Sequence, residues 1–365
     1  MRVLAWGTYD VRTHPRAGIL IEGLRASGVT VEEVDRPLGL STAERVRLLQ
    51  QPWRLPGLLL RVLRCWSWLA RHGLRSARAR PPDVVLVGYL GHFDVLLARL
   101  LFRRRAIVHD MLIFASDTAK DRGAGGMKQR LLRGLDRLAV AASDVVVLDT
   151  DEHADMLPSR QRAKACVVPV GAPAVWFASR RAVEHEDDLL RVVFFGLFTP
   201  LQGAVTIGEA AGLLADEPGI QLLLIGSGQD LAGAQQAAAG NPSVRWVPWV
   251  ESEELPATVG AHDVCLGIFG TGDKGHRVVP NKVFQGAAAG CALVTSDTPP
   301  QRRTLGDAAC FVPAGDAAAL ADALRRLRAD RALLVAMRSA AATVADRRFS
   351  PPVIVEPLLT RLFAR

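Results

Sequence analysis

A run of glycines and cations between residues 267 and 282 carries the clearest chemical signal in the sequence. Pro280 is typical of a first helical turn, so a helix is expected to begin there. The free amides and the positive dipole end of a helix N-terminus bind phosphate groups well. Four cationic side chains accompany them: Lys274, His276, Arg277 and Lys282. The segment predicts a diphosphate site that needs no metal, and the alternative is a solvated charged loop.

Two further glycine turns follow apolar runs in the same half of the chain. One is the segment 196–203, with a glycine at each end and Pro200 between them. The other is Gly226-Ser227-Gly228, which directly follows Ile225. Glycines at strand ends let a phosphate approach the backbone amides. Neither turn is a full dinucleotide fingerprint, so each alone is weak evidence.

Short apolar runs alternate with helical segments along the whole chain. Runs in the first half are expected as strands at residues 3–6, 29–34, 83–87, 106–108 and 145–148. Runs in the second half are expected at residues 192–195, 221–225, 243–247, 264–268, 292–295 and 310–312. This alternation predicts an α/β fold of two doubly wound, Rossmann-like domains that face each other across a ligand-binding cleft. A polar stretch after Pro173 marks the boundary, and we expect domains at 1–178 and 179–345.

Composition and charge exclude several classes of protein. Five scattered cysteines without CxxC spacing argue against a disulfide framework or a zinc site and favour a reducing cytoplasm. The sequence lacks the features of a signal peptide, a P-loop, an HExxH motif and a nucleic-acid module. We therefore expect no metal, no cofactor and no nucleic-acid partner.

Basic residues gather in the first half of the chain. Residues 1–175 contain 27 Lys and Arg against 17 Asp and Glu. This asymmetry indicates that the first half of the chain binds an anionic partner. The segment Trp53–Arg80 holds seven arginines, three tryptophans and no acid. It predicts either an amphipathic helix on an anionic membrane surface or an ordinary helix with Trp and Leu in the core. Location at the inner face of the plasma membrane fits the first interpretation.

Taken together, these segments resemble the retaining glycosyltransferases of family 4 (glycosyl transferases group 1), which have the GT-B fold. The family's Gly-x-x-x-Pro-x-x-Gly loop is matched by Gly196, Pro200 and Gly203, and its signature helix by Pro280–Gly290. Its base-gripping segment is matched by Trp246–Val250. The similarity implies an acceptor-binding first domain, a nucleotide-sugar-binding second domain, and a C-terminal helix over 346–365 that crosses back.

Four positions depart from the family pattern. The family's diphosphate Arg and Lys are replaced by Leu197 and Gln202, and its two glutamates by Arg277 and Gln285. An Arg can bind phosphate bidentately but cannot replace a carboxylate toward sugar hydroxyls, whereas a Gln can still hydrogen-bond a ribose. We expect that the diphosphate cations have moved to Arg277 and Lys282.

The resemblance and the residues together give a candidate site. The UDP- or GDP-linked donor is expected to contact Gly196, Gln202, Gly203, Gly226, Ser227, Val247, Pro248, Thr271, Gly272, Lys274, Lys282 and Gln285. The candidate catalytic residues are His109, Asp110 and Arg277, and the candidate acceptor contacts are Gly7, Thr8, His14 and Arg16.

The expected activity is transfer of a sugar from the nucleotide donor to an acceptor with retention of configuration. A sugar, a glycolipid of cell-surface polysaccharide synthesis or a small molecule could be the acceptor. Three alternatives stay open: a nucleotide-sugar epimerase or hydrolase of the same fold, an inactive partner protein, and a natural-product glycosyltransferase.

Overall fold

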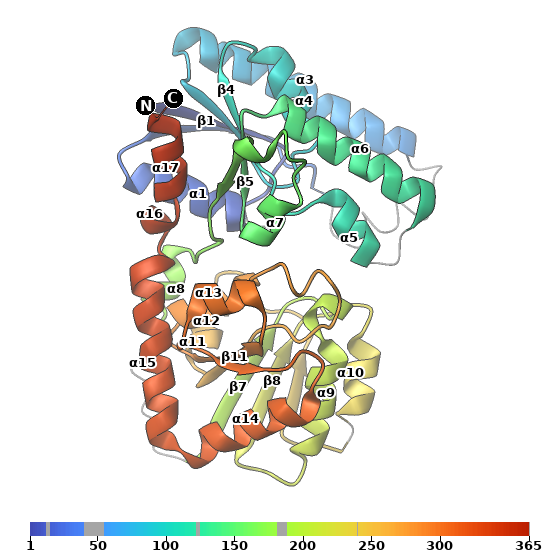
Figure 1. The fold of residues 1–365 in the computed structure, drawn as a ribbon, viewed down its shortest axis with the longest axis vertical. Helices are drawn as coiled ribbons and strands as arrows, with labels where there is room; N and C mark the ends of the chain where they lie inside the picture. Colours follow the sequence, from blue (N-terminus) through green and yellow to red (C-terminus); the bar gives the residue numbers. More distant parts are fainter. Residues whose placement is uncertain (12–14, 40–54, 122–124, 181–187, 239, 365) are drawn as a thin grey trace. The chain divides into compact units, whose positions relative to one another are not determined.

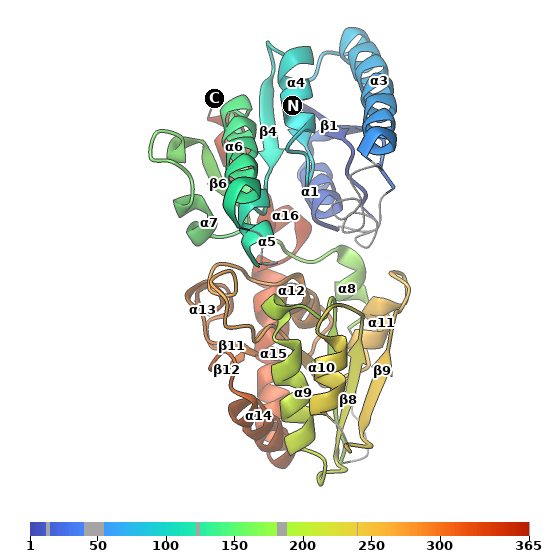
Figure 2. The same ribbon diagram turned by 90° about the vertical axis from the view of Figure 1, so that its right-hand side faces the viewer.

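A computed structural model describes residues 1–11, 15–39, 55–121, 125–180, 188–238 and 240–364. The chain forms two compact units (Figures 1 and 2). Unit 1 consists of Met1–Val168 and Val355–Arg365, and unit 2 of Pro169–Ile354. The units divide ten residues before the expected boundary at 178, directly after the last strand of unit 1.

The core of unit 1 is a six-stranded parallel sheet in the order β2-β1-β3-β4-β5-β6. Its strands are β1 (Arg2–Gly7), β2 (Thr30–Asp35), β3 (Val84–Val87), β4 (Ala106–Asp110), β5 (Val145–Leu148) and β6 (Ala165–Val167). Every residue of β3 and β5 is buried, because helices cover both faces of a parallel sheet. The larger helices are α1 (Pro15–Ala26), α3 (Leu55–Ala79), α4 (Asp94–Leu101), α6 (Gly126–Ala142) and α17 (Glu356–Phe363).

Unit 2 repeats this plan with strand order β12-β11-β10-β7-β8-β9, all parallel. Its strands are β7 (Leu190–Phe195), β8 (Ile220–Ile225), β9 (Val244–Val247), β10 (Val264–Leu266), β11 (Ala292–Ser296) and β12 (Cys310–Val312). Its main helices are α9 (Ala204–Leu213), α10 (Leu231–Ala237), α12 (Asn281–Ala288), α14 (Ala317–Ala329) and α15 (Arg331–Arg348). In Figure 1, α9, α10 and α14 cover one face of the sheet, while α12 contacts β10 and β11 on the other.

The expected fold class is confirmed, and the expected strands lie within one or two residues of the observed ones. Several elements were not expected, and two of them are instructive. One is β6, a strand of three residues at the edge of the sheet of unit 1. The other is α15, whose Ala- and Arg-rich sequence shows little apolar periodicity and which begins where the Asp330 side chain accepts a hydrogen bond from the Leu333 amide. Because α15 continues to Arg348 within unit 2, the chain rejoins unit 1 only at Val355.

Each sheet has one place where the strand order reverses, and ligands of doubly wound folds bind at the carboxyl ends of the strands there. In unit 2 the reversal falls between β7 and β10, and in unit 1 between β1 and β3. The loops that follow β7 and β10 contain the glycines and cations singled out in the sequence.

Candidate donor and acceptor sites

Three loops of unit 2 interlock at the carboxyl ends of β7, β8 and β10. The Phe198 amide donates to the Ser227 carbonyl at 2.9 Å, and the Phe269 amide donates to the Gln202 carbonyl at 3.0 Å. The Gly226 amide donates to the Val247 carbonyl at 2.8 Å, which joins the end of β9 to the same group. The turns that looked weak one by one in the sequence therefore form one continuous surface.

Glycine is required where these loops touch. A Cβ on Gly226 would lie 1.8 Å from the Gly196 carbonyl oxygen, and one on Gly270 would lie 2.2 Å from that of Pro200. Gly203, at the start of α9, has a φ of +66° and would place a Cβ 2.5 Å from the Phe269 carbonyl carbon. These neighbours are backbone atoms, so a side chain would force the loops apart.

Lys282 brings a cation to this surface from the first turn of α12. Its side chain is 5% exposed, and its ammonium donates a hydrogen bond to Gln202 Oε1. The same Nζ lies 3.9 Å from the centroid of the Phe194 ring, and it would be 3.3 Å from a Cβ built on Gly196. The ammonium of Lys282 therefore lies beside Gln202, the uncharged residue at a position where the family has a basic one.

The ammonium of Lys282 is poorly compensated inside the protein. Burial lowers its pKa to about 7, and no carboxylate in the described ranges pairs with it. Its titratable neighbour is Cys265, whose thiol pKa burial raises to about 12. A buried cation without a counter-ion is costly, so a bound anion would be stabilising there.

The other predicted donor residues line the same loops with different exposure. Thr271, Gly272 and Ser227 are exposed, Arg277 and Val247 are half-buried, and Lys274 and Gln285 are buried at 9% and 8% exposure. Gln285 follows Lys282 by three residues and lies on the same face of α12. Trp249, one residue after Pro248 in the expected base-binding segment Trp246–Val250, is 67% exposed and was not itself named as a donor contact. Its position next to the expected base contacts Val247 and Pro248 could have identified it from the sequence as a further base contact.

The predicted residues of unit 1 meet at the carboxyl ends of β1 and β4. Asp94 Oδ2 accepts hydrogen bonds at 2.7 Å from both the Thr8 amide and the Thr8 hydroxyl, directly after Gly7. Asp94 Oδ1 accepts from Trp66 Nε1 at 2.8 Å. A buried carboxylate therefore shapes the first loop. His14 lies outside the described residues.

Arg16 and Asp110 have an internal function in unit 1. The Arg16 guanidinium is 1% exposed, lies 3.2 Å from Asp110 Oδ1 and donates to the Val168 carbonyl at 2.8 Å. Asp110 is fully buried. This ion pair ties α1 to β4, and the expected roles of Arg16 as an acceptor contact and of Asp110 as a catalytic residue stay predictions.

His109 is also fully buried, at the end of β4. Within the described part of the chain neither of its ring nitrogens has a hydrogen-bond partner. Its ring lies edge-on to His92 with centroids 5.5 Å apart, and His92 Nε2 is 3.2 Å from Asp136 Oδ1. Burial and the neighbouring His92 hold the His109 pKa well below its usual range, so the imidazole is neutral. Its contact with a sugar remains a prediction.

Within the described ranges, no three His, Cys, Asp or Glu side chains gather into a group that could hold a metal ion. No helix of the described chain is both long and apolar enough to cross a bilayer.

Part of the chain matches a known protein family. Residues 190–330 match the family described as glycosyl transferases group 1. No curated protein sequence matches the chain.

Solved structures extend the similarity to the whole chain. HepE of Anabaena, solved in complex with UDP, is 13% identical with a TM-score of 0.68, and all of both chains is covered. Sucrose-phosphate synthase of Thermosynechococcus elongatus is 16% identical with a TM-score of 0.70, over 100% of this chain and 98% of that one. The UDP-forming trehalose-phosphate synthase of Burkholderia vietnamiensis is 15% identical with a TM-score of 0.65, over all of both chains. At these identities the likeness concerns the fold, and the match of residues 190–330 concerns the family. The chain therefore has the GT-B fold of these structures, and residues 190–330 match the glycosyl transferases of group 1.

Proposed function

We propose that the chain transfers a glycosyl unit from a UDP-sugar with retention of configuration, and that Lys282 binds the donor diphosphate. The observation that carries the proposal is the buried, carboxylate-free ammonium of Lys282 against Gln202 and Gly196. HepE has been solved with UDP and with UDP-glucose, which favours uridine over guanine as the base.

The remaining donor contacts follow from the interlocked loops. The amides at the start of α12, with Thr271, Gly272 and Lys274, would surround the diphosphate. Val247, Pro248 and the exposed ring of Trp249 would hold the base, and Gln285 the ribose. Arg277 would add a second cation, since an Arg can bind phosphate bidentately.

The reaction needs no nucleophile from the protein. The bond between the anomeric carbon and the diphosphate oxygen breaks while the acceptor oxygen bonds to the same face of that carbon. The acceptor proton passes to the departing diphosphate. Cations and helix amides stabilise the charge that grows on this leaving group, which is the main contribution required of the enzyme. Arg277 and Gln285 stand where the family has glutamates, so the signature helix offers no carboxylate to act as a nucleophile on the sugar.

The acceptor and the location belong to the proposal too. A glycolipid or sugar acceptor of cell-surface polysaccharide synthesis, used at an anionic membrane surface on the cytoplasmic side, fits the basic first half of the chain. A small-molecule acceptor would not require that charge.

Thermal unfolding with nucleotides tests the donor part of the proposal. A ligand at one hundred times its Kd stabilises the folded state by about 2.7 kcal/mol, so UDP should raise the Tm and GDP should not. Activity with UDP-sugars then separates the alternatives. Epimerised or hydrolysed donor without an acceptor would indicate another enzyme class, and no response to any nucleotide would indicate an inactive partner protein.

A further inference from the structure

Three helices of unit 1 form one layer over its sheet. Because α4 contacts both α3 and α6, the order across the layer is α3, α4, α6. Sixteen large apolar side chains are exposed in the described chain, and half of them belong to this layer. They are Leu59, Leu60, Leu63, Phe93, Leu100, Met127, Leu131 and Leu138.

The same layer is strongly basic on its outer side. Nine exposed cations stand on it: Arg61, Arg64, Arg71, Arg75 and Arg78 of α3, and Lys128, Arg130, Arg133 and Arg137 of α6. The three helices contain two acids, Asp94 and Asp136, and both are buried. Asp136 accepts hydrogen bonds from the amides of Ala115 and Ser116 inside the unit, so neither acid offsets the surface charge.

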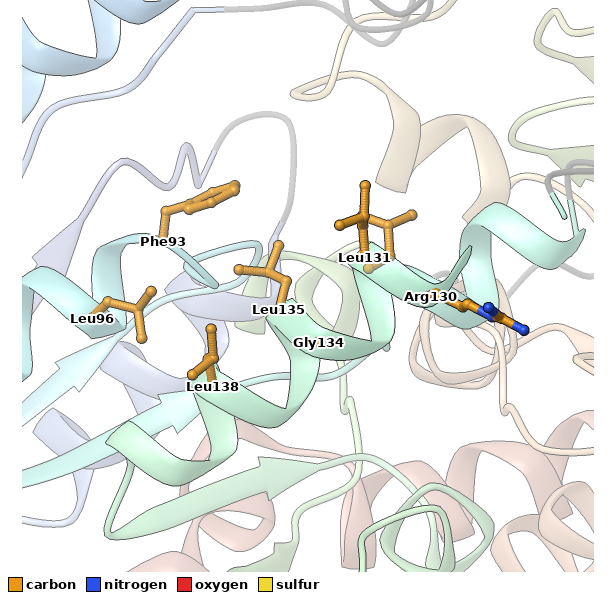
Figure 3. A pocket seen from close by; sticks show the side chains of 8 residues that line it. Phe93, Leu96, Arg130, Leu131, Gly134, Leu135 and Leu138 are labelled. Carbon is orange, nitrogen blue, oxygen red and sulfur yellow. The ribbon is translucent and has the colours of Figure 1, made fainter. Parts of the chain in front are cut away.

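A groove of about 500 Å³ opens between α4 and α6 (Figure 3). It is lined by Phe93 and Leu96 on one side and by Leu131, Leu135 and Leu138 on the other. Arg130, at its edge, points away from these apolar side chains (Figure 3). Leu131 is 68% exposed and Leu138 59%, so their apolar surface meets water.

We propose that this layer docks unit 1 on the surface of an anionic lipid bilayer, with Phe93, Leu131 and Leu138 entering the acyl boundary and the arginines contacting headgroups. Apolar side chains beside Lys and Arg are the composition that binds such interfaces. The inference deepens the proposed membrane location and rests on it.

Two other occupants fit the charges and dimensions less well. A second copy of the chain would bring one basic face against another, which costs energy in a twofold interface. An acidic peptide would fill the groove but leave α3 uncovered. That helix carries five exposed arginines and three exposed leucines over 25 residues, or about 37 Å. A flat anionic surface matches the whole layer.

The described tryptophans of the segment Trp53–Arg80 lie against the core, as in the ordinary-helix interpretation. Trp66 and Trp68 are half-buried and pack on the core of unit 1; Trp66 donates to Asp94, and Trp68 stacks on His72 with centroids 3.9 Å apart. Trp53 lies outside the described residues. The exposed leucines and Phe93 are therefore the side chains available to a membrane.

Vesicle flotation of the full chain tests the proposal. The protein should float with vesicles of phosphatidylcholine and phosphatidylglycerol at low salt, and stay behind with phosphatidylcholine alone. Changing Arg130, Arg133 and Arg137 to Gln should lower the partition coefficient by about a hundredfold, at about fivefold for each charge. The pair Leu131→Ser and Leu138→Ser should lower it by about tenfold or more.

A matched pair controls for the loss of exposed apolar surface. Leu213 and Val335 of unit 2 are 51% and 63% exposed, and their replacement by Ser should leave flotation unchanged. Absence of wild-type flotation, or equal flotation of all variants, would overturn the proposal. So would a dimer in sedimentation equilibrium that the Leu131→Ser, Leu138→Ser pair abolishes.

Nucleotide binding separates this failure from failure of the proposed function. All variants of the layer should keep the Tm increase caused by UDP. Loss of flotation with that increase retained concerns docking alone, whereas absence of a UDP response in the wild type concerns the donor site.

Discussion

At the scale of single residues, Lys282 is the side chain on which donor binding should depend most. The loop 196–203 contains no basic residue, and Lys282 brings a positive charge to it, since its ammonium contacts Gln202 and lies near Gly196. Lys282→Met should weaken UDP binding by about 1.5–3 kcal/mol, the value typical of a hydrogen bond to a charged group. Calorimetry measures this, and Lys128→Met, an exposed lysine of unit 1, is the control. Unchanged affinity would remove Lys282 from the site.

The titration of Lys282 gives a second prediction. Its pKa is about 7 in the fold against 10.5 for a free lysine, so between these values the unfolded chain binds more protons than the folded one. The free energy of unfolding should therefore rise with pH from about 7 to 10.5, and the full desolvation penalty should apply below that range. Lys282→Met should remove this dependence and raise the Tm at pH 6 by about 2–4 °C. Thermal unfolding of both proteins from pH 6 to 9 measures this dependence. A lower Tm for Lys282→Met than for the wild type at pH 6 would contradict the prediction.

Proton uptake reports the same group during binding. A diphosphate favours the charged ammonium, so UDP binding at pH 8 should take up a proton. Calorimetry in two buffers with different ionisation enthalpies should show this uptake in the wild type and its loss in Lys282→Met.

At the scale of elements, the donor site depends on backbone contact between loops. Gly270→Ala places a methyl group against the carbonyl oxygens of Pro200 and Leu201, at 2.2 and 2.5 Å. We expect a loss of about 1–3 kcal/mol of stability together with weaker UDP binding, because the loops must separate. Gly57 of α3 meets no atom within 4 Å, so Gly57→Ala should instead stabilise the protein by up to about 1 kcal/mol. Full UDP affinity in Gly270→Ala would show that the interlock is dispensable.

Helix α3 and the first loop of unit 1 are joined through Asp94. Trp66→Phe removes one donor from this buried carboxylate and should cost about 1.5–3 kcal/mol of stability without changing UDP affinity. Trp249→Ala should do the reverse, since this exposed ring supports no core but can stack on a base for about 1–3 kcal/mol. Denaturant titration and calorimetry on both variants distinguish the two roles. Equal effects on stability would mean that Trp249 is structural.

At the scale of the whole molecule, the proposed reaction has a stereochemical signature. Proton NMR of the product should show the donor's anomeric configuration, and activity should survive EDTA. An inverted product, or activity that chelation abolishes and manganese restores, would mean that the fold carries a different mechanism here. His109→Phe adds a second readout. It should raise stability, because two unpaired buried nitrogens disappear, and lower kcat only if the imidazole orients the sugar.

The sequence by itself determined the two parallel α/β sheets and the glycine loops at their strand ends. Fully buried strands read as continuous apolar runs, and the breaks between them are marked by Gly and Pro, so these features are local. It also indicated which cations could replace the family's missing pair. The strand β6 was not among the expected ones.

Only the tertiary structure decided which of those residues meet. Lys282 and Gln202 are 80 residues apart, and Arg16 and Asp110 are 94 apart, yet the first pair is brought to the donor loops and the second is enclosed in a core. Likewise, the sequence of the basic helix α3 was compatible with tryptophans that face either solvent or the core. The structure places them against the core, where Trp66 donates a hydrogen bond to Asp94. The hydrophobic periodicity of one element shows which of its faces is apolar and which is polar. It does not show what packs on each face, because burial depends on packing between segments distant in the chain.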